Sequence, residues 1–260
     1  MTRQQFQAVR QRFADYTATF AAAEHSLPPM LQLKKDHSER VAGEALALAQ
    51  ALGWAPGEKI VAKALGLLHD VGRFSQYADF GTFSDAASVD HGERGWEVVC
   101  REGWLHGLAA PAAERIAFGI RYHNRRALPD NIPATVMPWV ACIRDADKVD
   151  IYNVVLEAVD RDGFRDLPDM LPGVTLDRRV SEAMLDNASQ CAGGALACVR
   201  TLGDFLVLQM TWVYDINYAP TLARMRERGV IPRLLAHVES TPAVRRLAQD
   251  IEEYVRNRGG

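Results

Sequence analysis

Residues 65–77 read LGLLHDVGRFSQY, and this stretch decides how the rest of the chain is interpreted. Apolar residues precede His69 at intervals of four, so the histidine continues the apolar stripe of a helix predicted over Gly57–Val71. Asp70 follows it directly. An imidazole and a carboxylate that are buried without partners cost free energy. We therefore expect His69 and Asp70 to meet other polar groups or a metal ion.

Apolar residues recur at helical spacing along almost the whole chain, and there is no convincing alternation of strand residues. Helices are predicted over Arg3–Glu24, Leu33–Leu52, Gly57–Val71, His91–Glu102, Ala112–His123, Ala134–Val159, Asp177–Asp186, Ala195–Tyr214, Pro220–Arg228 and Thr241–Arg258. Gly72–Val89 shows no such pattern and is expected to be a long irregular loop, a type of segment that is often functional. Asp90 is expected to cap the helix that follows it. The pattern predicts an all-α protein with one domain over residues 1–260, whose helices after about residue 160 complete or cover the core.

The composition is that of an ordinary globular protein, because 48% of its 260 residues are hydrophobic and 24% are charged. A net charge of −3 gives no electrostatic footprint for nucleic acid or anionic lipid, so neither partner is expected. The N-terminus lacks the apolar core of a signal peptide, and Arg200 and Asp204 interrupt the most apolar late stretch. Four scattered cysteines without a close CxxC pair are expected to be reduced. We expect a cytoplasmic protein; its oligomeric state is left open.

Six ionisable residues lie at the ends or on the apolar faces of the predicted helices. They are His37, His69, Asp70, His91, His123 and Asp147. His123, for example, follows Ile116 and Ile120 on one helical stripe. For any single histidine, a hydrogen-bonded place in the core is the commoner explanation. Four of the seven histidines lie in such positions, each on a different predicted helix, and this joint pattern favours a shared site instead.

This order of residues resembles the HD superfamily of metal-dependent phosphohydrolases, in the variant with two additional histidines. The local sequences that carry the resemblance are KKDHSERV, LGLLHDVGRFSQY, SVDHGERG, IRYHNR and RDADKVD, over about residues 33–155. The resemblance implies an HD-domain helical bundle with additional C-terminal helices. It implies a small phosphorylated substrate, such as a nucleotide. The synthetase half of stringent-response enzymes and the GYP motif of cyclic-dinucleotide phosphodiesterases are absent from the chain.

The resemblance also implies roles for the six residues. Asp70 would bridge two metal ions and is the expected catalytic residue, His37, His69 and Asp147 would hold one ion, and His91 and His123 would complete the second. Nitrogen and oxygen ligands without thiolate suit Fe, Mn, Co, Ni or Zn. Two such ions roughly 3.5–4 Å apart would lower the pKa of a shared water, so that a metal-bound hydroxide serves as the nucleophile.

The last ligand has alternatives within RDADKVD, which contains Asp145, Asp147 and Asp150. We favour Asp147 because its helical stripe, with Val140 and Ile143, is the more apolar. Asp145 is the second candidate, and either carboxylate is a candidate for supporting a ligand instead.

Arg73, Lys148 and Asn124 are candidates for binding the substrate, and Arg125 adjoins them in sequence. A cation beside a dinuclear site can hold a phosphate. The alternative is that Arg73 and Lys148 form structural ion pairs with carboxylates such as Asp85 or Asp90, and the sequence favours neither.

The sequence thus predicts a phosphohydrolase that uses divalent transition metal, with two ions expected. A mixed-valent diiron oxygenase of the HD fold is a rival, since some of these oxygenases use the same order of ligands. A binding protein that uses metal only to stabilise its fold is a third hypothesis.

Overall fold

The computed structural model describes residues 1–22, 26–161, 164–165, 171, 173–189 and 196–259. These residues form helices joined by turns, and the one β-contact among them is a single bridge between Thr175 and Thr201. The predicted all-α fold is confirmed. The chain divides into two compact units, Met1–Asp150 and Ile151–Gly260. The single domain inferred from sequence stays a prediction.

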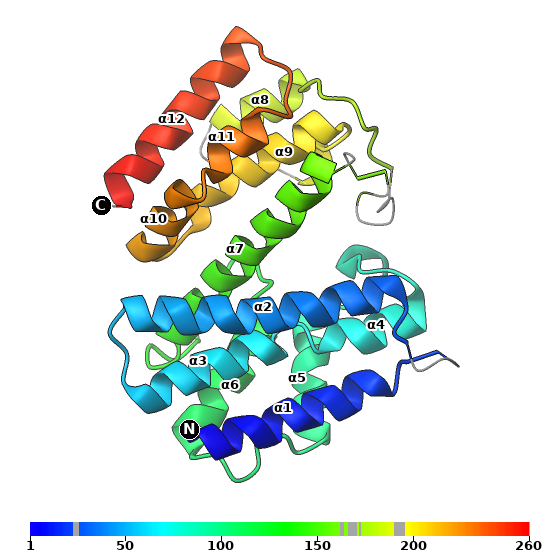
Figure 1. Ribbon diagram of the computed structural model, residues 1–260, viewed down its shortest axis with the longest axis vertical. Helices are drawn as coiled ribbons and strands as arrows, with labels where there is room; N and C mark the ends of the chain where they lie inside the picture. The colour runs from blue at the N-terminus through cyan, green and yellow to red at the C-terminus, as the bar shows by residue number, and fades with distance from the viewer. Residues whose placement is uncertain (23–25, 162–163, 166–170, 172, 190–195, 260) are drawn as a thin grey trace. The chain divides into compact units, whose positions relative to one another are not determined.

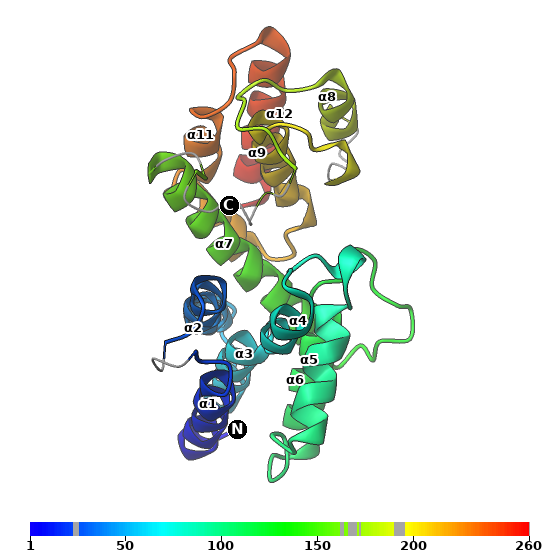
Figure 2. The ribbon, with the colours of Figure 1, turned by 90° about the vertical axis from the view of Figure 1, so that its right-hand side faces the viewer.

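The first unit contains six complete helices and the first half of a seventh among its described residues. They are α1 (Arg3–Ala18), α2 (Pro29–Ala51), α3 (Pro56–Leu68), α4 (Gly72–Phe80), α5 (His91–Arg101), α6 (Ala110–Tyr122) and α7 (Met137–Arg161), with a short 3₁₀ turn η1 (Asp85–Ala87) before α5. Helices α2 and α3 lie side by side in both ribbon views, and α5 runs beside α6 (Figures 1 and 2). The elements that carry the candidate residues are therefore neighbours in space.

Two glycines allow the helices near the candidate residues to approach one another closely. A Cβ atom on Gly66 would lie 2.7 Å from both the Cα of Ala42 and the carbonyl oxygen of Val41 on α2. A Cβ atom on Gly72 would lie 2.3 Å from the carbonyl oxygen of His91. Both contacts are with backbone atoms, which cannot turn away as a side chain can. A larger residue at Gly66 would push α3 away from α2, which carries His37, and one at Gly72 would push α4 away from α5, which carries His91.

The structure corrects the prediction of an irregular segment over Gly72–Val89, because its first half forms α4. Phe74 is fully buried and packs edge-on against Phe13 of α1, with ring centroids 5.9 Å apart. Only Gly72, Phe74 and Gln76 of this helix are buried. Because the buried face is so narrow and partly polar, tertiary packing rather than an apolar period makes the segment helical.

Other helix boundaries differ from the predictions for local reasons. Helix α2 begins at Pro29, four residues earlier than predicted, since proline is well suited to the first turn of a helix. Helix α1 ends at Ala18, and the predicted end at Glu24 lies outside the described residues. Asp90 caps α5 as predicted, since its side chain accepts a hydrogen bond from the backbone N–H of Glu93 at 2.9 Å.

The second unit continues from α7 through five further helices in its described part. They are α8 (Glu182–Ser189), α9 (Leu202–Thr211), α10 (Ala219–Glu227), α11 (Val230–Leu235) and α12 (Pro242–Arg258), with 3₁₀ turns η3 (Leu196–Cys198) and η4 (Trp212–Asp215) on either side of α9. The continuous helix predicted over Ala195–Tyr214 is wrong, because Thr201 caps a new helix and 3₁₀ turns flank it. Helix α11 was not predicted, since six residues are too few to show a helical period.

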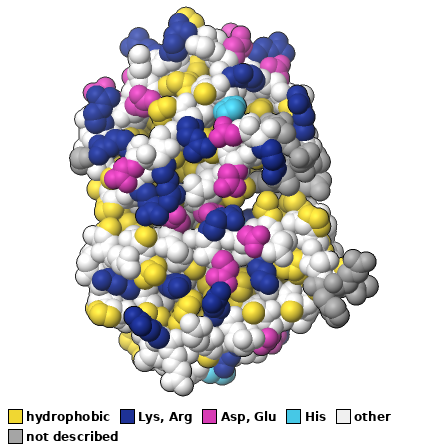
Figure 3. All heavy atoms as spheres, in the orientation of Figure 1, with side chains coloured by type: hydrophobic (Ala, Val, Ile, Leu, Met, Phe, Trp, Pro, Cys, Tyr) yellow, Lys and Arg dark blue, Asp and Glu magenta, His cyan; other side chains and the backbone are white. Residues whose placement is uncertain are grey.

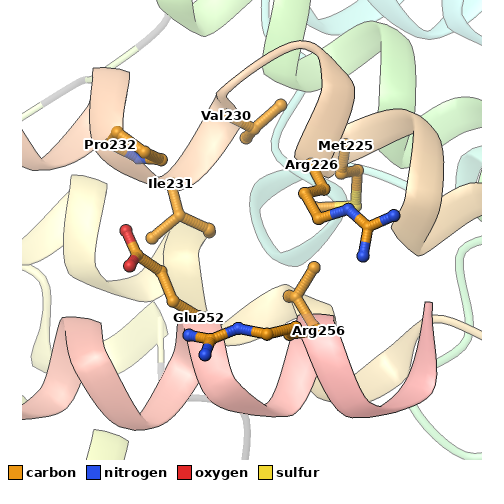
Figure 4. A pocket seen from close by; sticks show the side chains of 8 residues that line it. Met225, Arg226, Val230, Ile231, Pro232, Glu252 and Arg256 are labelled. Carbon is orange, nitrogen blue, oxygen red and sulfur yellow. The ribbon is translucent and has the colours of Figure 1, made fainter. Parts of the chain in front are cut away.

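The second unit contains a cavity of about 210 Å³ between α10, α11 and α12. Figure 4 shows Met225, Val230 and Ile231 on its apolar wall, with the guanidinium of Arg256 and the carboxylate of Glu252 extending from α12. None of the candidate residues identified from the sequence lines it.

Positively and negatively charged side chains are interspersed over the face drawn in Figure 3, without a large area of one sign. None of the described helices is both long enough and apolar enough to cross a membrane.

Candidate metal centre

The structure brings all six sequence-predicted ligands together in the first unit. His37 lies in the middle of α2, His69 and Asp70 follow the last turn of α3, His91 is the first residue of α5, His123 follows the last residue of α6, and Asp147 lies on α7. They form three overlapping groups whose ligand atoms all lie within 4.8 Å of one another. The groups are His37 with His69 and Asp70, His69 with His123 and Asp147, and Asp70 with His91 and His123. Residues that are 110 positions apart in the chain thus share one polar cluster.

Asp70 lies at the centre of this cluster, and its two carboxylate oxygens face different histidines. Oδ2 lies 3.7 Å from Nε2 of His37 and 3.6 Å from Nε2 of His69. Oδ1 lies 3.4 Å from Nε2 of His91 and 3.6 Å from Nε2 of His123. The side chain is only 4% exposed. A carboxylate placed in this way can give one oxygen to each of two cations.

Asp147 joins the cluster on the side of His37 and His69. Its Oδ1 lies 3.1 Å from Nε2 of His37 and 3.5 Å from Nε2 of His69. Asp145 is fully buried, but it belongs to none of the three groups found among the described residues. Asp150 contacts the opposite edge of the His37 ring. The geometry therefore agrees with Asp147, the first choice from sequence, as the residue that faces the interior of the cluster.

Two of the four histidines are supported by carboxylates. Nδ1 of His37 lies 2.7 Å from Oδ2 of Asp150, and Nδ1 of His91 lies 2.6 Å from Oδ2 of Asp85. Arg40 donates to the other oxygen of Asp150 at 2.8 Å. A carboxylate can only accept at these contacts, so Nδ1 carries the proton and Nε2 keeps its lone pair toward the cluster. Such a carboxylate fixes the ring and raises the basicity of the ligating nitrogen.

The other two histidines are supported by backbone carbonyl groups three residues earlier in the chain. Nδ1 of His69 donates to the carbonyl oxygen of Gly66, and Nδ1 of His123 donates to that of Ile120, both at 2.8 Å. These carbonyls belong to the last turns of α3 and α6, where they have no partner within the helix. Each pair of histidines therefore contains one ring held by a carboxylate and one held by the end of its own helix.

The inward-facing nitrogens need a positive partner. Nε2 of His37 lies 3.3 Å from Nε2 of His69, and Nε2 of His91 lies 3.1 Å from Nε2 of His123. Two lone pairs at these distances repel each other unless a proton or a metal ion lies between them. Four imidazoles and two carboxylates without a thiolate suit Fe, Mn, Co, Ni or Zn. The donor set thus fits divalent transition metal, and it is arranged as two groups of ligands that share Asp70.

The electrostatics keep the carboxylates ionised. Burial favours the neutral form of Asp70, but Lys34 and His69 outweigh it and hold its pKa well below the usual value. The pKa of Asp147 is also held well below its usual value, because hydrogen bonds from His37 and His69 outweigh burial. Both carboxylates are therefore charged and available as ligands throughout the physiological pH range.

Two of the histidines respond to burial in opposite ways. Burial, reinforced by the nearby positive charge of Arg73, lowers the pKa of His91 to about 4. For His37, hydrogen bonds to Asp147 and Asp150 outweigh burial and the charge of Lys34, so its pKa is raised. His91 is thus neutral and ready to bind metal at neutral pH, whereas His37 has the stronger tendency to hold a proton that metal would displace.

The structure places the predicted substrate contacts around the cluster. Arg73 donates to Oδ1 of Asp85 at 2.9 Å and to the carbonyl oxygen of Phe83 at 2.6 Å. Asn124 lies behind the His91 ring, where it donates to Asp85 at 3.2 Å. These contacts agree with the structural ion pair that was one of the two alternatives for Arg73. Substrate binding by these residues stays a prediction.

The contacts of Lys148, the remaining candidate, and of Arg125, which follows Asn124 in sequence, are with other groups. Nζ of Lys148 lies 3.5 Å from the carbonyl oxygen of Arg144, one turn earlier on α7. Arg125 pairs with Asp90 at 3.1 Å. Neither of these contacts reaches a ligand atom of the cluster.

Sequence analysis did not single out Lys34, whose ammonium nitrogen lies 2.7 Å from Oδ2 of Asp70. Its position gives a signal, because Lys34 precedes His37 by three residues and so lies on the same side of α2. Asp85 was considered only as an ion-pair partner for Arg73 or Lys148, and nothing in the spacing shows that it supports His91. That contact depends on the fold of the segment between α4 and α5.

Residues 35–161 match the family model of the HD domain. No curated protein and no solved structure matches the chain. The matched segment contains all six clustered residues and extends from α2 to the end of α7. This part of the chain is therefore an HD domain, as the resemblance implied, and its clustered histidines and aspartates can hold metal.

Proposed function

We propose that the protein is a metal-dependent phosphohydrolase that cleaves a phosphate ester or anhydride of a nucleotide or another small phosphorylated metabolite. The HD-domain family generally includes metal-dependent phosphohydrolases, and the matched segment carries the complete set of candidate ligands. We further propose that two divalent ions bind, one held by His37, His69 and Asp147, the other by His91 and His123, with Asp70 shared between them.

The observation that carries the proposal is the position of Asp70. Each of its oxygens faces its own pair of histidine nitrogens, at 3.4–3.7 Å. A site that only stabilised the fold around one ion would not need a buried carboxylate shared between two sets of ligands. Hydrolytic sites that bind two ions use such a shared ligand to hold the ions close together.

The chain itself supplies binding and orientation. Divalent ions, when bound, supply Lewis acidity and lower the pKa of water. Asp150 and Asp85 hold the His37 and His91 rings with their lone pairs inward. The cluster is most accessible near Asp147, whose side chain is 19% exposed, whereas His69 is fully buried. We expect substrate to approach from the side of Asp147.

The test is to load the purified chain separately with Mn²⁺ and Fe²⁺ and to incubate it with nucleotides and generic phosphoesters without oxygen. Release of phosphate by the Mn²⁺ form supports the proposal. The control is Asp70→Asn, which removes the shared charge but keeps the shape of the side chain.

Two outcomes would contradict the proposal. In a parallel incubation with oxygen, consumption of oxygen by the Fe²⁺ form alone, dependent on substrate and without release of phosphate, would favour the diiron oxygenase. Binding of metal without turnover in either form would favour a protein that uses metal only for stability.

A further inference from the structure

Lys34 is the one cation with a direct contact to Asp70 shorter than 3 Å among the described residues. Its Nζ lies 2.7 Å from Oδ2, on the side of the carboxylate that faces His37. The side chain is 17% exposed, so it lies at the accessible edge of the cluster. We propose that Lys34 binds the phosphoryl group of the substrate, an inference that rests on the phosphohydrolase function proposed above.

Two arginines close to the cluster each have a nearer carboxylate partner that is not a proposed metal ligand. Arg73 pairs with Asp85 at 2.9 Å, and its Nε lies farther from Oδ1 of Asp70, at 3.6 Å. Arg40 pairs with Asp150 at 2.8 Å. These ion pairs also have a structural role, because each carboxylate supports a histidine ring. Using Arg73 or Arg40 for the substrate would weaken that support.

In the described part of the chain, Lys34 pairs with no carboxylate other than Asp70. Its direct contacts are with Asp70 and with the ring of Phe83, whose centroid is 5.6 Å from Nζ. An ammonium group has three N–H donors, and Asp70 accepts only one of them. The remaining donors lie beside the carboxylate that the ligand groups share, where an anion bound to the metal centre would meet them.

When metal binds at Asp70, we expect the ammonium group of Lys34 to need another anionic partner. A divalent ion on Oδ2 of Asp70 would repel the ammonium and compete for the same oxygen. The four-carbon stem of lysine is flexible, so the ammonium can turn toward a nearby acceptor without moving α2. A phosphoryl oxygen, which carries negative charge, is the acceptor that matches both the ammonium and the metal ions.

The charges around the cluster also indicate which phosphate is preferred. Among the groups named above, the four carboxylates of Asp70, Asp85, Asp147 and Asp150 face the three cations Lys34, Arg40 and Arg73. Two divalent ions would therefore leave a clear positive excess. A terminal phosphoryl group with about two negative charges balances this excess better than a diester with one. The inferred substrate class is a phosphomonoester or the terminal phosphate of an anhydride.

The first experiment measures binding of inorganic phosphate to the full-length, Mn²⁺-loaded protein by calorimetry. The variants are Lys34→Met, Lys34→Arg and the control Lys35→Met, which removes the adjacent lysine of the same helix. We expect Lys34→Met to weaken phosphate binding at least tenfold, as loss of a charged hydrogen bond does, and Lys34→Arg to retain most of it. Lys35→Met should bind phosphate like the wild type.

Metal content, measured by elemental analysis, separates substrate binding from support of the metal centre. Lys34→Met should hold Mn²⁺ as tightly as the wild type or more tightly, because the ammonium no longer competes at Asp70. A loss of metal in parallel with the loss of phosphate binding would overturn the inference. Lys34→Gln serves the same comparison if Lys34→Met does not fold.

The second experiment compares p-nitrophenyl phosphate with bis(p-nitrophenyl) phosphate. Lys34→Met should lower kcat/KM at least tenfold more for the monoester than for the diester, and an equal loss would overturn the assigned substrate class. If the wild type binds and releases phosphate but Lys34→Met does so equally well, the role of Lys34 is wrong and the phosphohydrolase stands. If the wild type itself neither binds phosphate nor hydrolyses either ester, the phosphohydrolase and the role of Lys34 both fail.

Discussion

Replacement of Asp150 by asparagine tests how the metal centre is supported. The carboxylate is fully buried and lies 2.7 Å from Nδ1 of His37. Asparagine keeps the shape but removes the charge, and its NH₂ group can turn toward Nδ1 and favour the tautomer with the proton on Nε2. That tautomer cannot bind metal through Nε2. Loss of such a supporting carboxylate typically weakens metal affinity about 10–100-fold, which corresponds to about 1.4–2.8 kcal/mol.

The effect should be confined to the ion held by His37. His91 keeps its own support from Asp85, so the second ion should dissociate at nearly the wild-type chelator concentration. We also expect the metal-free protein to lose about 1–3 kcal/mol of folding stability, mainly from the bond to His37. The ion pair with Arg40 adds little to this cost, because the Arg40 side chain is 43% exposed.

The measurement is elemental analysis after dialysis against a series of chelator concentrations. Asp150→Asn should lose about one ion per chain at a concentration that leaves the wild type loaded, and Asp85→Asn should lose the other ion instead. Asp36→Asn is the matched control, because Asp36 adjoins His37 in sequence but is exposed and bonded to Gln32. Retention of both ions by Asp150→Asn with wild-type affinity would refute the proposed support.

Three further predictions follow from the geometry. Gly66→Ala should lower the free energy of unfolding by about 1–3 kcal/mol, because its Cβ would meet backbone atoms at 2.7 Å. Gly43→Ala, which meets nothing within 4 Å, should raise it by up to about 1 kcal/mol in the same denaturant titration. When chelator has removed the metal, the folded chain protonates His91 only near pH 4, because its pKa is lowered to about 4. The unfolded chain protonates the same residue near pH 6.5, so between about pH 6.5 and 4 it holds one more proton than the folded chain. As pH falls through this window, the free energy of unfolding of the wild type should therefore decrease by up to about 1.4 kcal/mol per pH unit more than that of His91→Asn. Parallel plots of unfolding free energy against pH for the two proteins would contradict the lowered pKa. Asp70→Ala should reduce turnover more than His123→Ala, since one residue serves both proposed ions and the other serves one; equal kcat values for these two metal-replete variants would count against a shared ligand.

Helical periodicity was sufficient to predict the fold class and most of the helices, because amphipathic helices show their buried face directly in the sequence. It missed α4, in which only three residues are buried, and α11, which is six residues long. In both cases the local pattern is too weak to indicate a helix. Contacts such as that between Phe74 and Phe13 stabilise α4, and no local pattern records them.

The sequence alone also determined which residues are candidate ligands, because their order and their positions on apolar helix faces are properties of the chain. Only the tertiary structure decided how they are used. Asp70 could be seen to face two histidine pairs, and Asp150 to support His37, 113 residues away in sequence, only after distant helices had been packed together. The same holds for the nearest cation at Asp70. Arg73 is three residues away in sequence but lies 3.6 Å from Asp70 and pairs more closely with Asp85, whereas Lys34, 36 residues away, makes the 2.7 Å contact. Side-chain direction is set by the packing of whole helices, so sequence proximity to the motif could not choose between these two cations.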